Sequence, residues 1–86
     1  MVIPSMQMCD GPHGLRKQNV GSRTDMLGIN ESVPAICFPA EVTTAASWDI
    51  NLLERVGSAI GQEAKVQNIG LVLGPGVNTK RNPLCG

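Results

Sequence analysis

The sequence predicts an α/β fold, and three features of the chain support this prediction. Two short apolar runs, at residues 2–9 and 69–73, each lead into a polar loop rich in glycine and proline. Between them, residues 50–65 repeat apolar side chains at the spacing of a helix that buries one face. A strand, a helix and a second strand in this order form a βαβ unit, in which the strands are parallel and their carboxyl ends share one edge of a sheet.

The first strand is expected at residues 2–9. Pro4 falls near its start, where a missing backbone N–H is tolerated, and Asp10 follows its carboxyl end. Residues 11–31 show no sustained periodicity, which predicts a loop of the length that usually carries function. Residues 33–46 are apolar and small but contain two prolines, so a short strand and a short helical turn both fit them.

The clearest element is a helix at residues 50–65. Asp49 can accept hydrogen bonds from the free N–H groups of its first turn. Glycine weakens a helix by about 1 kcal/mol relative to alanine, so Gly57 and Gly61 indicate a tight contact between this helix and a strand. The apolar face, at helical spacing, consists of Leu53, Val56, Gly57, Ile60 and Ala64.

The second strand is expected at residues 69–73. Asn68 suits the left-handed position that follows a helix. The run that comes after it is almost continuously apolar, which is typical of a strand covered on both faces.

Length and composition limit the class of protein. The 86 residues suffice for one small domain, and the 42% hydrophobic content is compatible with a core. The formal net charge is zero and the 7 lysines and arginines are scattered, so nucleic acid is not an expected partner. Cys9, Cys37 and Cys85 form no C-x-x-C pair, so we expect reduced thiols and neither a disulfide scaffold nor a metal site.

No membrane association and no cofactor are expected. No apolar run approaches the roughly 20 residues that span a bilayer, and Met1 is not followed by a secretory leader, which predicts a soluble, cytoplasmic protein if Met1 is the true start. The run before Thr79-Lys80 differs from a phosphate-binding loop, because the threonine precedes the lysine and Pro75 removes a backbone donor.

The segment Asp10-Gly11-Pro12 has two interpretations. It can be a simple turn, since aspartate bonds its own backbone and glycine and proline favour unusual dihedral angles. It can also place a carboxylate at a strand end to accept hydrogen bonds from two neighbouring sugar hydroxyls. Arg16 and Lys17 are either solvated loop charges or partners of that carboxylate. No pair of carboxylates stands out as nucleophile and acid, so no catalytic residue is assigned.

A series of short motifs extends these interpretations to a family. In consecutive order they resemble the amino-terminal domain of glycoside hydrolase family 3, of the β-glucosidase type. The resemblance runs from about Ile3 to the end of the chain. The motifs are Asp10-Gly11-Pro12-His13-Gly14-Leu15-Arg16, Cys37-Phe38-Pro39, Ala46-Ser47-Trp48-Asp49, Gly61-Gln62-Glu63-Ala64 and Gly74-Pro75-Gly76-Val77-Asn78-Thr79-Lys80-Arg81-Asn82-Pro83.

The resemblance implies that residues 1–86 are an amino-terminal fragment of a family 3 catalytic domain and form the first βα units of a (β/α)8 TIM-type barrel. It implies that Asp10 binds hydroxyls of the sugar, and we expect Arg16, Lys17 and Arg81 to support the surrounding loops. The implied substrate is a β-glucoside or oligosaccharide.

Family 3 enzymes retain configuration by using a carboxylate nucleophile and a carboxylic acid. The resemblance places both after the position of Gly86, so the isolated 86-residue chain is expected to be inactive without the remainder of a glycosidase chain. A non-catalytic sugar-binding or interaction protein and an inactive gene remnant remain as alternatives.

Overall fold

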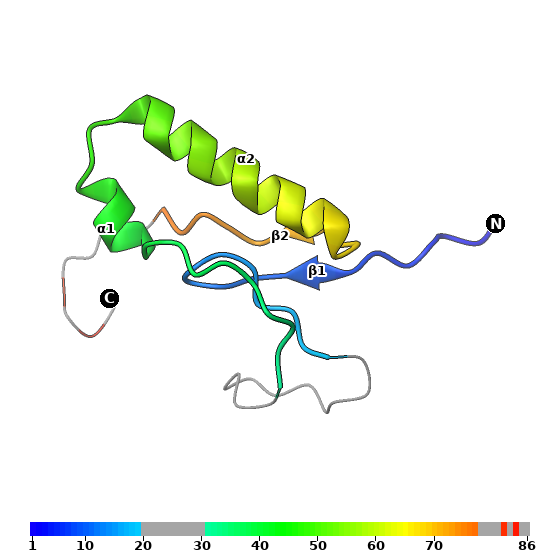
Figure 1. Ribbon diagram of the computed structural model, residues 1–86. Helices are drawn as coiled ribbons and strands as arrows, with labels where there is room; N and C mark the ends of the chain where they lie inside the picture. Colours follow the sequence, from blue (N-terminus) through cyan, green and yellow to red (C-terminus); the bar gives the residue numbers. More distant parts are fainter. Residues whose placement is uncertain (20–30, 78–81, 83, 85–86) are drawn as a thin grey trace.

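The computed structural model describes residues 1–19, 31–77, 82 and 84. In chain order they form β1 (Met8–Cys9), α1 (Glu41–Ala45), α2 (Ile50–Val66) and β2 (Leu71–Val72). Figure 1 shows α2 lying along one side of the two strands, while the chain after β1 and the chain before α1 run together on the other side. The described residues are therefore of α/β type, as the sequence predicts.

The two strands pair in parallel, which confirms the expected βαβ order. Met8 lies opposite Leu71 and Cys9 opposite Val72, and the backbone bonds continue one residue beyond each end of the pair. β1 is much shorter than the expected strand at residues 2–9. No partner strand lies beside residues 2–6 within the described part of the chain, and without one an extended segment cannot form a ladder.

Helix α2 begins at the residue that the sequence predicts and ends one residue later than expected. The Asp49 carboxylate accepts a hydrogen bond from the backbone N–H of Leu52 at 3.0 Å. At the other end Asn68 has a φ of 56°, and the N–H of Ile69 donates to the carbonyl of Ala64 at 2.9 Å. This is the Schellman arrangement, and the contact between Ile69 and Ala64 aims the chain from α2 into β2.

Asp49→Ala is expected to reduce the helicity of α2 because the first-turn N–H groups lose their acceptor, at a cost of about 1 kcal/mol. Far-ultraviolet circular dichroism measures the loss. Ser58→Ala, at an exposed position inside the same helix, is the matched control and is expected to raise helicity slightly. Equal signals from the two variants would contradict a capping role for Asp49.

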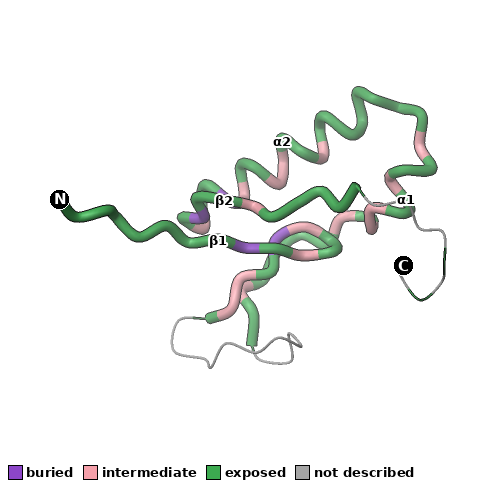
Figure 2. The backbone as a smooth tube through the Cα atoms, turned by 180° about the vertical axis from the view of Figure 1, so that it is seen from behind, coloured by how far each residue is buried: buried purple, intermediate pink, exposed green. Residues whose placement is uncertain are grey.

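The core of the described chain is small. Its buried members are Cys9, Leu15, Ala64 and Ile69, with Ile60 and Val72 packed against them. Figure 2 shows the buried positions clustered where β1, β2 and the carboxyl end of α2 meet, with most of the backbone exposed.

Two predictions about the sheet require correction. The second strand was expected to be covered on both faces, but Leu71 is 42% exposed and Leu73 58%. The described residues form a two-stranded sheet and no TIM barrel. A pair of two-residue strands has too few neighbours to cover both faces, so these apolar side chains are left open.

The segment at residues 33–46, for which a strand and a helical turn both fitted, contains the short helix α1 and no strand.

The surroundings of the glycines of α2 also differ from the prediction. A Cβ added at Gly57 or Gly61 would meet no atom within 4 Å, so neither glycine makes the tight helix-on-strand contact. In Figure 1 the amino-terminal end of α2 lies farther from the strands than its carboxyl end.

Gly57→Ala and Gly61→Ala are therefore expected to raise the helicity of the 86-residue chain, each by a gain of about 1 kcal/mol in helix propensity. Circular dichroism compares each variant with the parent. Gly76→Ala is the control. Gly76 lies outside the helices, and a Cβ there would lie 2.5 Å from a carboxylate oxygen of Glu41, so this substitution is not expected to raise helicity. A fall in helicity in the Gly57 or Gly61 variant would show that this face is packed.

Candidate functional site

The candidate site lies at the carboxyl edge of the parallel strands. Asp10 directly follows β1, and residues 73–76 directly follow β2. Because the strands are parallel, both segments leave the sheet at the same edge, where α1 also lies (Figure 1). This edge is where α/β proteins place their binding residues.

Asp10 is held by Arg16 through backbone and side chain. The Arg16 N–H donates to the Asp10 carbonyl at 3.0 Å, and its guanidinium donates to Asp10 Oδ1 at 2.9 Å. A Cβ at Gly11 would lie 2.1 Å from the Gly14 carbonyl, so only glycine fits this tight turn. The Asp10 side chain nevertheless remains 55% exposed. The carboxylate is thus oriented by one partner and open to solvent.

Lys17 ties the far side of the same loop to α2. Its ammonium group donates to the carbonyl of Gln67, the residue that caps the carboxyl end of α2, at 2.7 Å. A cation at this end of a helix interacts favourably with the unpaired carbonyls and the helix dipole. The loop that begins at Asp10 is therefore anchored at residue 17 to the turn that leads into β2.

His13 contacts the segment that precedes α1. Its carbonyl accepts from the Phe38 N–H at 2.8 Å, and its Nδ1 lies 3.0 Å from the Phe38 carbonyl. Gly14 beside it has a φ of +112°, and a Cβ there would lie 3.0 Å from the Phe38 ring. The segment before α1 is thus fitted closely against the Asp10 loop.

Two glutamates bind backbone N–H groups of other segments. Glu41, in α1, accepts from the N–H of Gly76 at 2.7 Å and holds the chain after β2. Glu63, in α2, accepts from the N–H of Ile36 at 3.0 Å. The site residues predicted from the sequence include neither glutamate. For Glu63 the sequence does contain a signal, because it lies three residues after Ile60 on the apolar face of α2.

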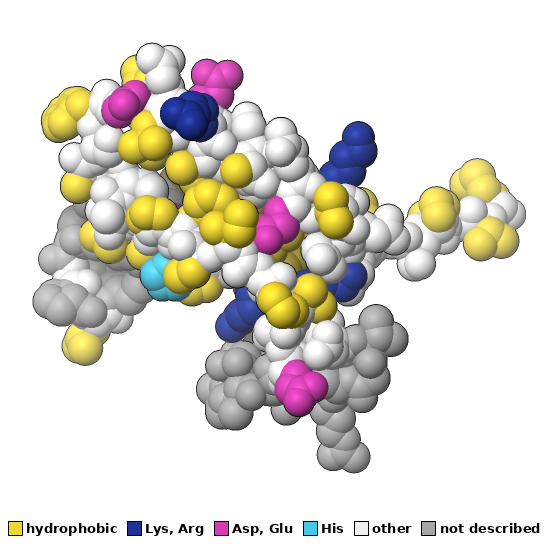
Figure 3. Space-filling view, in the orientation of Figure 1, with side chains coloured by type: hydrophobic (Ala, Val, Ile, Leu, Met, Phe, Trp, Pro, Cys, Tyr) yellow, Lys and Arg dark blue, Asp and Glu magenta, His cyan; other side chains and the backbone are white. Residues whose placement is uncertain are grey.

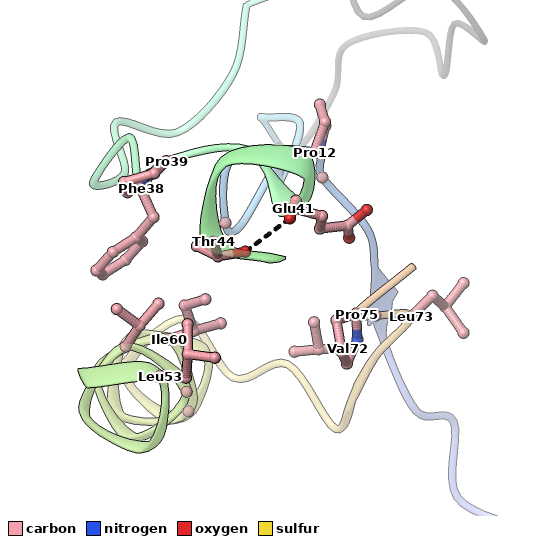
Figure 4. A pocket seen from close by; sticks show the side chains of 16 residues that line it. Pro12, Phe38, Pro39, Glu41, Thr44, Leu53, Ile60, Val72, Leu73 and Pro75 are labelled. Carbon is pink, nitrogen blue, oxygen red and sulfur yellow. Dashed lines mark hydrogen bonds between the residues drawn. The ribbon is translucent and has the colours of Figure 1, made fainter. Parts of the chain in front are cut away.

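A mostly apolar cavity of about 400 Å³ opens between the middle of α2 and the carboxyl edge of the strands. In Figure 4, Phe38, Leu53 and Ile60 line one side of it, and Val72 and Pro75 the other. Hydrophobic side chains gather across this face of the molecule in Figure 3. The cavity also borders the Asp10 loop, at Gly11, Pro12 and Gly14.

The structure brings together some of the predicted site residues. Asp10 and Arg16 form an ion pair, and Lys17 lies on the same loop but contacts Gln67 instead. Arg81 lies outside the described residues. Within the described ranges there is no cluster of three or more metal-ligating side chains, and no helix there is long and apolar enough to cross a membrane.

Comparison with known proteins identifies the relatives of the chain. No family model matches it. It is 55% identical over 84 residues to the thermostable beta-glucosidase B of Acetivibrio thermocellus. It is 45% identical to an exo-alpha-(1->6)-L-arabinopyranosidase of Bifidobacterium longum, and 43% identical to the probable beta-glucosidase I of Emericella nidulans.

Each of these matches covers 98% of this chain but only 11%, 11% and 9% of the respective relative, so the chain spans about a tenth of the length of the curated relatives it matches. The chain is therefore homologous to one segment of these β-glucosidases and arabinopyranosidases, which is consistent with the resemblance to the β-glucosidase type of glycoside hydrolase family 3.

Proposed function

We propose that this chain is the glycone-binding segment of a retaining β-glucosidase, with residues 1–86 forming the first βα units of a (β/α)8 barrel domain. The observation that carries the proposal is the position, orientation and exposure of the Asp10 carboxylate. Its carboxylate stands at the carboxyl end of β1, is oriented by Arg16 through Oδ1, and is 55% exposed.

This arrangement suits the recognition of a sugar. An ionised carboxylate only accepts hydrogen bonds and offers about four lone-pair positions on its two oxygens. Arg16 uses one of them, which leaves acceptors for two adjacent hydroxyl groups of a pyranose. Hydrogen bonds to a charged acceptor are about twice as strong as neutral ones, so they can fix the orientation of the ring.

Two other carboxylates, those of Glu41 and Glu63, hold backbone segments in place. Glu41 and Glu63 each accept from a backbone N–H of a distant segment, so each already has a structural role in this part of the chain. Retaining hydrolysis needs two carboxyl groups about 5–5.5 Å apart. In this proposal both come from another part of a glycosidase chain, and this segment binds the sugar without taking part in bond cleavage.

A chimera tests the proposal. The whole chain would replace the matching segment of the thermostable beta-glucosidase B of Acetivibrio thermocellus, to which it is 55% identical. We expect the chimera to hydrolyse an aryl β-glucoside with kcat/KM within about tenfold of the parent enzyme. A chimera that melts cooperatively near the parent yet hydrolyses no glucoside would contradict the proposal.

A further inference from the structure

Glu63 occupies an unusual position for a helix glutamate. It lies on the same face of α2 as Ile60, where Oε1 accepts from the Ile36 N–H at 3.0 Å. The second oxygen, Oε2, is buried and has no hydrogen-bond partner among the described residues. Burying a carboxylate oxygen without a partner costs free energy, so solubility does not explain a glutamate here.

The segment that Glu63 holds is the one that supports the Asp10 loop. Ile36 and Phe38 are two residues apart, and Phe38 makes two polar contacts with His13, one to its carbonyl and one to its ring. A Cβ at Gly14 would lie 3.1 Å from the Ile36 carbonyl and 3.0 Å from the Phe38 ring. The contact leaves little room for independent movement of the two segments.

We propose that Glu63 is a positioning residue for Asp10. Its carboxylate fixes residues 36–38 to α2, these residues fix His13 and Gly14, and the tight turn from Gly11 to Gly14 then fixes the direction of the Asp10 carboxylate. The inference rests on the proposed function, because it assigns Glu63 to the same sugar-binding loop. Glu63 itself touches no substrate.

The expected effect is on substrate binding. Without the Glu63 acceptor, residues 36–38 lose their attachment to α2 and the Asp10 loop can shift. A misplacement of about 1 Å in a binding group costs up to about a hundredfold. In the chimera, Glu63→Ala is therefore expected to raise KM for the aryl β-glucoside at least tenfold and to leave kcat within threefold, since binding to substrate and transition state is weakened alike.

Conservative variants separate positioning from folding. Glu63→Gln keeps an oxygen that can accept from Ile36 and is expected to restore KM to within twofold of the unmodified chimera. Glu63→Asp withdraws the carboxylate by one methylene and is expected to behave like the alanine variant, which keeps the test valid if Glu63→Ala does not fold. Gln62→Ala, at the exposed neighbouring position, is the control and is expected to change neither constant.

Hydrogen exchange gives a readout independent of activity. Amides of residues 11–16 are expected to exchange at least tenfold faster in Glu63→Asp than in Glu63→Gln. Equal exchange, or a KM unchanged in Glu63→Asp, would overturn the role of Glu63. If Asp10→Ala lowers activity while every Glu63 variant matches the unmodified chimera, this inference fails and the proposed function stands. If Asp10→Ala has no effect, the proposed function fails and this inference fails with it.

Discussion

Asp10→Ala in the chimera is expected to lower kcat/KM for an aryl β-glucoside by about 10²- to 10⁴-fold. A hydrogen bond to a charged group contributes about 1.5–3 kcal/mol, and the Asp10 carboxylate is proposed to accept two from the sugar. Each 1.36 kcal/mol of lost transition-state stabilisation corresponds to a factor of ten in rate, which gives this range. Steady-state kinetics on the purified chimera measures it.

The stability of the Asp10 variant is the control for this result. The ion pair with Arg16 is exposed on both sides, and such pairs contribute about 0–1 kcal/mol. The melting temperature is therefore expected to change little while activity falls. Asp10→Asn, which keeps the shape but loses the charge, is expected to lie between the parent and Asp10→Ala. An Asp10→Ala chimera with kcat/KM within threefold of the parent would exclude Asp10 from sugar binding.

Local features of the fold could be predicted because neighbouring residues determine them. Asp49 caps α2 by accepting from the N–H of Leu52, only three residues away in the sequence. Asn68, with its left-handed backbone, lies just after the end of α2. The parallel pairing of β1 and β2 follows from the order strand, helix, strand. The position of Asp10 at the carboxyl edge of the sheet could be predicted for the same reason, because the strand direction fixes that edge.

Features that depend on distant segments could not be predicted. The contact of Glu41 with Gly76 joins residues 35 apart, and that of Glu63 with Ile36 joins residues 27 apart. The place of Glu63 on the apolar face of α2 is a signal for the glutamate but does not identify its partner. No local pattern identifies the partner of Glu41, or the Gln67 carbonyl as the partner of Lys17. The glycines of α2 indicated close packing in the sequence, but in the described chain they border an open cavity.

The same open surface predicts how the isolated chain behaves in solution. A compact monomer of 9.1 kDa exposes about 4,900 Å², whereas this chain exposes 7401 Å². Its radius of gyration is 14.6 Å, against about 12 Å for a compact domain of this length. The chain therefore buries much less surface than a self-sufficient domain of equal size.

We expect the isolated 86-residue chain to melt without a cooperative transition and to bind a hydrophobic dye such as ANS. The buried core contains only four hydrophobic residues among those described, while Trp48 is 99% exposed. Dye fluorescence and a thermal scan of circular dichroism test this together. A sharp transition with no dye binding would show that the chain is a self-sufficient domain and would favour a stand-alone binding protein.

The chimera provides the matched comparison for the isolated chain. In the proposed barrel domain the cavity between α2 and the carboxyl edge of the strands faces the rest of a glycosidase, so its apolar lining is expected to become covered. Amides of β2 and of the first half of α2 are expected to exchange at least a hundredfold more slowly in the chimera than in the isolated chain, because exchange follows the free energy of local opening. Equal exchange in the two would mean that the rest of a glycosidase does not pack on this face, which would remove the physical basis for a shared barrel domain.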